Sequence, residues 1–184
     1  MASIPSPSFP RDTARLRLRL HEPADSVWPQ HIYSQPEVCR YLQEEPWTTT
    51  DAVKNVSDRM KKTDLTGPSA ALAIVIEHDR TPIGDVALWL TNKDYAVAEI
   101  GWVLDPEFSG KGFAREAVSE VLQFPFETHG LHRVAAQMDA RNISSAKLAA
   151  AVGMRQEAHL RQDWWNKGEW TDTLVFAMLN SDRT

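Results

Sequence analysis

Apolar and polar residues alternate along several segments of the chain, which is the period of a strand with one buried face. The clearest segment is 15–20, where three arginines alternate with three leucines. A solvated polar face is the simplest account of those arginines. Six further segments have the length and residue content of strands. We expect strands over residues 15–20, 70–77, 83–90, 95–104, 132–138, 156–165 and 170–178.

Helical spacing of apolar residues lies between these segments. Pro29 and Pro36 are expected to break residues 25–41 into two short helices. Further helices are expected after residues 48–51, over 115–127 and over 142–152. The resulting order is a strand, helices, a three-stranded antiparallel meander, a helix, a strand, a helix and a final hairpin. That order predicts an α/β fold, a mixed sheet with helices on both faces.

The composition is that of a globular protein with one core. The chain has 184 residues, 42% of them hydrophobic and 24% charged. A folded chain of this length buries roughly 70% of the surface that it exposes when unfolded, and needs no disulfide or metal to do so. We expect one domain over residues 14–180. Residues 1–13 hold three prolines and three serines and are expected to form a flexible arm, with Phe9 as a candidate anchor.

Charge, cysteine and histidine content argue against several classes of function. Twenty Lys and Arg against 25 Asp and Glu give a formal net charge of −5, the opposite sign to most nucleic-acid or anionic-membrane binders. Cys39 is the only cysteine, and the six histidines lack metal-binding spacing, so neither a disulfide nor a metal site is expected. The N-terminal residues lack a secretory signal, and the apolar runs fall far short of the ~20 residues of a membrane span. The expected location is the cytoplasm.

A glycine-bearing loop over residues 109–114 joins a predicted strand to a predicted helix. Gly110 and Gly112 let a ligand approach the main chain, and the helix start offers unpaired N–H groups and a positive dipole end, a combination suited to a pyrophosphate. The spacing is neither a P-loop nor a dinucleotide fingerprint. A turn that simply requires two glycines explains the loop equally well.

Three other polar residues stand at informative positions. Asn142 is a natural N-cap with Ser145 at the third helical position, and capping alone explains both. The functional alternative is a second helix start that holds a polar ligand chain beside a hydroxyl donor. Glu99 interrupts an apolar strand; it either faces solvent or lies in a cleft where a raised pKa would let it accept a proton.

Taken together, these segments resemble the GCN5-related N-acetyltransferases (GNAT family), and within them the RimJ/RimL-like branch. The resemblance runs from about residue 14 to 179 and is carried mainly by AEIGWVLDPEFSGKGFAREAV, GLHRVAAQMDARNISSAKLAAAVGM and HLRQDWWNKGEWTDTLVFAML. It implies a mostly antiparallel seven-stranded sheet whose fourth and fifth strands part to admit acetyl-CoA.

The resemblance also implies a set of cofactor contacts. The family's pyrophosphate pattern, Gln/Arg-x-x-Gly-x-Gly/Ala, falls on residues 109–114; Gly112 and Ala114 fit it, and Ser109 departs from it. The strand edge over 102–104 would meet the pantetheine amides, Asn142 the pantetheine arm, and Lys147 a CoA phosphate, unless it is a solvated lysine. The implied acetyl-CoA contacts are Trp102, Val103, Leu104, Ser109, Gly110, Lys111, Gly112, Phe113, Ala114, Asn142 and Lys147.

The expected reaction is direct attack of a primary amine on the acetyl thioester, which requires a base, an oxyanion donor and help for the leaving thiolate. Glu99 is the candidate base, with a water chain as the alternative. Ser145 is the candidate donor to the thiolate, and Ser144 is the alternative donor. The acceptor is either a protein N-terminus, as in ribosomal-protein acetylation, or a small-molecule amine. A non-catalytic acyl-CoA-binding module and a purely structural domain remain alternatives.

The tryptophans of the final hairpin have two explanations. Trp164, Trp165 and Trp170 either line an acceptor pocket or pack across the strands. The same hairpin could support a homodimer, although the sequence does not set the oligomeric state.

Overall fold

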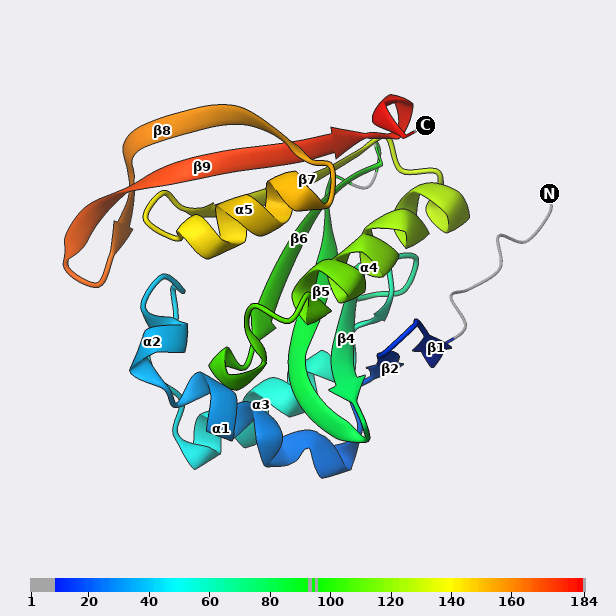
Figure 1. Cartoon of the computed structure of the whole chain (residues 1–184), viewed down its shortest axis with the longest axis vertical. Coiled ribbons are helices and arrows are strands. Elements are labelled where there is room, and N and C mark those ends of the chain that lie inside the picture. The colour runs from blue at the N-terminus through cyan, green and yellow to red at the C-terminus, as the bar shows by residue number, and fades with distance from the viewer. Residues whose placement is uncertain (1–8, 93, 95, 184) are drawn as a thin grey trace.

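The computed structural model describes residues 9–92, 94 and 96–183, and its strands form one sheet (Figure 1). Within the described residues nine strands lie in the order β1-β2-β4-β5-β6-β7-β9-β8, with β3 paired to β4. Among the strands that the structure describes, only β6 and β7 are parallel neighbours. The strands are β1 (Arg11–Asp12), β2 (Arg17–Leu20), β3 (Thr63–Asp64), β4 (Ala71–His78), β5 (Thr81–Asn92), β6 (Val97–Leu104), β7 (Arg133–Asp139), β8 (Arg155–Asn166) and β9 (Glu169–Leu179).

The mixed, mostly antiparallel sheet is confirmed, and the expected count of seven strands is corrected to nine among the described residues. The two additional strands, β1 and β3, have two residues each, which is too short to show an alternation. Tyr95, the expected start of the strand over residues 95–104, lies outside the described residues, and β6 begins at Val97.

The two short α-helices expected over residues 25–41 are present, and the break between them falls at Ser34 and Gln35, just before Pro36. Pro29 and Pro36 each lie in the first turn of a helix, where the fixed φ of proline fits and its missing N–H is not needed. The helices are α1 (Trp28–Tyr33), α2 (Pro36–Cys39), α3 (Thr49–Arg59), α4 (Phe113–His129) and α5 (Ile143–Ala151), with 3₁₀ helices at Pro23–Ser26, Pro106–Phe108 and Asn180–Asp182. No helix of the described residues is long and apolar enough to cross a membrane.

Helices cover both faces of the sheet, as expected. Residues of α4 and α5 share the main core with Ala98 and Ile100 of β6. Val103 of the same strand packs against a second cluster formed by Ile32, Tyr33, Trp47 and Ala52. Because successive side chains of a strand point to opposite faces, Ile100 and Val103 mark the two faces of β6.

The N-terminal segment contacts the rest of the chain from Phe9 onward. The Phe9 ring lies 6.2 Å from the ring of Phe124, so the expected anchor is present. The next residues form β1, which pairs with β2. Residues 9–13 thus contact the rest of the fold through a ring contact and strand pairing, and the flexibility expected over residues 1–13 stays a prediction. Residues 1–8 lie outside the described residues.

The sheet opens between β6 and β7, as Figure 1 shows. The two strands pair at three positions: Val97 with Arg133, Ala98 with Val134 and Glu99 with Ala135. Beyond Glu99, β6 continues beside β5, and β7 continues beside β9. The carboxyl ends of the two parallel strands therefore diverge, which is the parting of the fourth and fifth long strands that the resemblance implied.

Candidate active site

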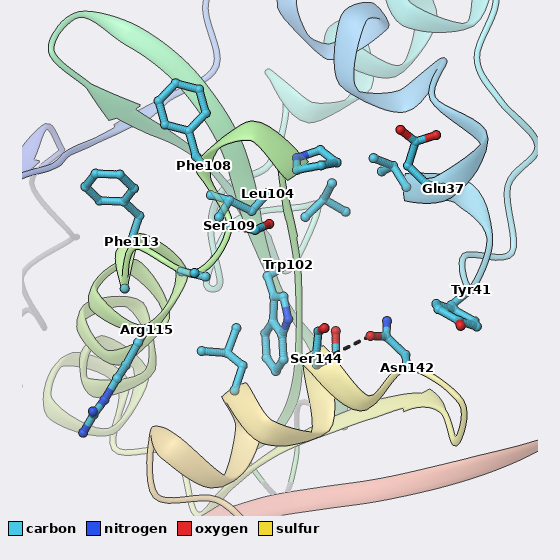
Figure 2. A pocket seen from close by; sticks show the side chains of 18 of the residues that line it. Glu37, Tyr41, Trp102, Leu104, Phe108, Ser109, Phe113, Arg115, Asn142 and Ser144 are labelled. Atoms are coloured by element: carbon cyan, nitrogen blue, oxygen red, sulfur yellow. Dashed lines mark hydrogen bonds between the residues drawn. The ribbon is translucent and has the colours of Figure 1, made fainter.

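A cavity of about 480 Å³ lies where β6 and β7 diverge (Figure 2). Its walls come from α2, the carboxyl half of β6, the loop from β6 to α4, and the first turns of α4 and α5. All but three of the predicted site residues line it: Trp102, Val103, Leu104, Ser109, Gly110, Gly112, Phe113, Ala114, Asn142 and Ser145. The fold thus brings three separate sequence motifs around one space.

The loop between β6 and α4 turns through two glycines in the left-handed region. The φ angle is +74° at Gly110 and +82° at Gly112, values that other residues rarely adopt. Gly112 immediately precedes α4, and no side chain caps that helix. The first N–H groups of α4 have no partner within the helix, and the helix dipole is positive at this end. The two explanations of the glycines, a turn and an anion site, are therefore compatible, because the turn brings backbone N–H donors to the cavity wall.

The β6 residues Trp102, Val103 and Leu104 line the cavity along the part of the strand that does not pair with β7. On the opposite edge they pair with β5. One row of backbone N–H and C=O groups therefore faces the opening, where an extended amide-bearing chain could pair with it. Figure 2 shows the Trp102 indole in the middle of the cavity, between α4 and α5.

Asn142 and Ser145 lie at the start of α5, and the predicted cap is present. The Asn142 Oδ1 atom accepts a hydrogen bond from the Ser145 backbone N at 3.1 Å, drawn as the dashed line in Figure 2. Both residues are half-buried and line the cavity. The cap uses only the amide oxygen of Asn142 and the backbone of Ser145. The Asn142 NH₂ group and the Ser145 hydroxyl are thus left available to a ligand, so capping and binding are not exclusive. Ser144 also lines the cavity and is more exposed.

Glu99 lies at the vertex of the opening, in the last β6–β7 pair. Its side chain is half-buried, which is intermediate between the solvent-facing and the cleft-bound alternatives that the sequence left open. Burial raises the pKa of the Glu99 carboxyl, and a hydrogen bond from Gln137 Nε2 at 3.3 Å opposes part of that shift. Glu99 is not among the residues that line the cavity. A group that reaches it must therefore come to the vertex rather than to the cavity wall.

Lys111 and Lys147 are the other predicted residues outside the cavity lining. Both are exposed, and the Lys111 Nζ atom lies 5.2 Å from the centre of the Phe108 ring. The exposure of Lys147 fits the solvated alternative, and its contact with a CoA phosphate stays a prediction. Among the residues that the structure describes, no group of His, Cys, Asp and Glu side chains could hold a metal ion.

One wall of the cavity was not anticipated. Glu37 and Tyr41, from α2 and the residues after it, face the opening across from the glycine loop (Figure 2). Arg115, in the first turn of α4, also lines the cavity. Arg115 follows the glycine loop directly, so its position beside the predicted anion site was a usable signal. The sequence held no signal, beyond the resemblance, that would place the α2 wall at the cavity, because α2 lies far along the chain from residues 109–145.

The hairpin of β8 and β9 holds this wall in place. At its tip, Lys167 Nζ donates to the Cys39 carbonyl oxygen at 2.6 Å, and Asn166 Nδ2 donates to that of Leu42 at 3.2 Å. In Figure 1 the tip lies beside α2. Because Leu42 lines the cavity, the hairpin fixes the side of the opening that faces α5.

Two of the three tryptophans of the hairpin, Trp165 and Trp170, pack across its strands. Trp165 and Trp170 are cross-strand partners whose ring centres lie 5.4 Å apart, edge to face. With Trp164 they are 46–57% exposed, and none of the three lines the cavity. These contacts favour the packing alternative over the acceptor pocket.

Comparison with known proteins agrees with this geometry. A family model described as an acetyltransferase (GNAT) domain matches residues 15–155. The chain belongs to the GNAT family of acetyltransferases. Among curated relatives, an uncharacterized N-acetyltransferase, p20, of Bacillus licheniformis is 28% identical over 170 residues, which cover 92% of this chain and 96% of that protein. The spermidine N(1)-acetyltransferase of Vibrio cholerae is 24% identical over 168 residues, covering 91% and 95%.

Solved GNAT structures share the fold. An acetyltransferase of this family from Bacillus anthracis superposes with a TM-score of 0.83 at 25% identity, covering 92% of this chain and 98% of that one. RimL, a ribosomal L7/L12 α-N-protein acetyltransferase in complex with coenzyme A, superposes with a TM-score of 0.82 at 16% identity, covering 92% and 97%.

Proposed function

We propose that this GNAT acetyltransferase transfers the acetyl group of acetyl-CoA to a primary amine at the opening between β6 and β7. The observation that carries the proposal is the divergence of those strands beside the uncapped, glycine-led start of α4. An extended amide chain ending in a pyrophosphate matches both parts: strand-edge groups for the amides, and backbone N–H groups with a positive dipole end for the phosphates.

Acetyl-CoA, when bound, would supply a thioester carbonyl that an amine can attack directly, so the protein needs no nucleophile of its own. Residues 109–114 would bind the pyrophosphate through backbone N–H groups, and the Ser109 departure from the family pattern leaves those groups in place. The β6 edge at 102–104 would pair with the pantetheine amides. The Asn142 NH₂ group would donate to the pantetheine arm.

Glu99 would accept a proton from the incoming ammonium, directly or through water. The supporting observation is its place at the vertex, where burial raises the pKa of its carboxyl. A backbone N–H on the β6 edge would donate to the carbonyl oxygen as it gains charge. The Ser145 hydroxyl would donate to the departing sulfur from the first turn of α5, where the helix dipole also favours negative charge.

The acceptor is proposed only as a class. Similar proteins are named for spermidine and for a ribosomal protein α-amine, and both acceptors carry primary amines. Placement in the RimJ/RimL-like branch stays a prediction, since likeness to RimL at 16% identity concerns the fold.

The proposal is tested by calorimetry with CoA and acetyl-CoA, followed by an assay of free thiol with a panel of amines. The panel contains spermidine, peptides with free N-termini, and the N-acetylated form of each as its matched control. We expect CoA to bind, and thiol release with at least one free amine but not with its acetylated form. Binding without release on any amine would support the non-catalytic module, and no binding would overturn the proposal.

We expect Glu99→Gln to lower kcat about 100-fold near pH 7, the low end for a general base because water reaches this half-buried side chain. Between the raised pKa of Glu99 and the pKa of the amine, ~7.7 for a peptide N-terminus or ~10.4 for an alkylamine, the wild type has a carboxylate to deprotonate the ammonium. Near pH 10 the amine is increasingly neutral, and the two profiles should converge. The measurement is kcat against pH from about 6 to 10. Glu127→Gln, at the far end of α4, is the matched control. Parallel profiles for the wild type and Glu99→Gln would remove Glu99 as the base.

A further inference from the structure

Arg15 holds the glycine loop from outside the cavity. It lies in the turn between β1 and β2, and its Nη1 donates to the Lys111 carbonyl oxygen at 2.9 Å. The guanidinium lies 4.5 Å from the centre of the Phe113 ring. Its Nη2 atom would be 3.3 Å from a Cβ placed on Gly112. A single side chain thus touches three consecutive residues at the start of α4, and it does not line the cavity itself.

This contact orients the peptide between Lys111 and Gly112. In a trans peptide the C=O and N–H bonds point in opposite directions. Since the Lys111 carbonyl faces Arg15, the Gly112 N–H faces away from it. Gly112 lines the cavity and Arg15 does not, so the arrangement directs this donor toward the ligand side of the loop.

Arg15 also engages the carboxylate of Glu116, which lies in the first turn of α4. Glu116 Oε2 accepts from Arg15 Nε at 2.7 Å, while Oε1 accepts from the Arg15 backbone N at 2.8 Å and from Thr13 Oγ1 at 2.6 Å. Burial raises the pKa of Glu116, but the hydrogen bonds from Thr13 and Arg15 outweigh it and keep the pKa below its usual value. The carboxylate therefore stays ionised, and without Arg15 it would repel an anion bound at this helix start.

We propose that Arg15 is a positioning residue for the pyrophosphate of CoA: it orients the Gly112 N–H and neutralises Glu116, and so raises affinity for ligands that carry a pyrophosphate. The inference rests on the proposed acetyl-CoA site. The Arg15–Glu116 ion pair contributes little to the stability of the fold, because the Arg15 side chain is 44% exposed and exposed ion pairs are weak. Stability therefore does not explain the pair by itself.

The test compares Arg15→Gln with Arg17→Gln. Arg17 lies two residues further along the chain, at the start of β2, is exposed, and pairs with Asp12 at 3.3 Å. Calorimetry with CoA should show about tenfold weaker binding by Arg15→Gln, the loss of one charge-assisted contact, and unchanged binding by Arg17→Gln. The melting temperatures of the two ligand-free variants should be similar.

A second readout separates positioning from general damage. Acetyl-pantetheine carries the same thioester as acetyl-CoA and lacks the pyrophosphate. With an amine identified in the panel, Arg15→Gln should lower kcat/KM for acetyl-CoA about tenfold and spare kcat/KM for acetyl-pantetheine. Equal losses with both thioesters, or CoA binding within twofold of Arg17→Gln, would overturn the role of Arg15. Failure of the wild type to bind CoA would instead overturn the proposed function.

Discussion

We expect Gly112→Glu to abolish CoA binding, with a loss of affinity of roughly a thousandfold, because two like charges about 4 Å apart near a protein surface repel by ~4 kcal/mol. The new carboxylate would stand at the start of α4, where the pyrophosphate is proposed to lie. The backbone adds to the effect, since φ at this position is +82° and a Cβ would lie 3.3 Å from Arg15 Nη2. Titration calorimetry of CoA into the variant measures the loss.

The matched control is Gly130→Glu, at the other end of the same helix. Gly130 also has a positive φ, +59°, and a Cβ there would meet nothing within 4 Å. The control therefore carries the same charge and a similar backbone strain, about 25 Å away along a 17-residue helix. It should lose stability yet bind CoA as the wild type does. If CoA bound to both variants with affinities within tenfold of each other, residues 109–114 would not be the pyrophosphate site.

The secondary structure was predictable where its pattern is local. The alternation over residues 15–20 contains β2, and the apolar stripe over 115–127 lies within α4. β3 was missed because two residues show no period and their pairing partner, β4, follows only after a loop. Pro29 did not fix the residue at which α1 begins, because a proline in the first turn of a helix and a proline that ends a preceding turn look alike in the sequence.

The parts of the site that the sequence indicated are those that lie within single short segments. Gly110 and Gly112 form a loop that leads into α4, and Asn142 caps the helix that carries Ser145. The local structure of each motif is therefore set by residues that are neighbours in the sequence. Arg15 could not be found in this way. Its contacts with Lys111 and Glu116 span 96 and 101 residues, and they depend on where the β1–β2 turn lies against α4.

Ser145→Ala is expected to lower kcat about 100-fold, the lower range for loss of a positioned proton donor, while CoA affinity stays unchanged. The hydroxyl lies at the cavity wall in the first turn of α5. The cap of that helix uses the Ser145 backbone N, which alanine retains, and alanine favours helix more than serine does. The substitution should therefore leave both α5 and the Asn142 side chain in place. Steady-state kinetics and CoA calorimetry on the same preparation test this.

Ser144→Ala is the matched control, because Ser144 carries a hydroxyl on the same turn and also lines the cavity. A loss confined to Ser145→Ala would identify the half-buried hydroxyl as the donor, whereas a loss confined to Ser144→Ala would transfer the role to its neighbour. Unchanged kcat in both would mean that the thiolate departs with help from the α5 dipole alone. Since the cap survives in either variant, a fall in kcat at constant CoA affinity separates proton donation from helix capping, the alternative that the sequence could not exclude.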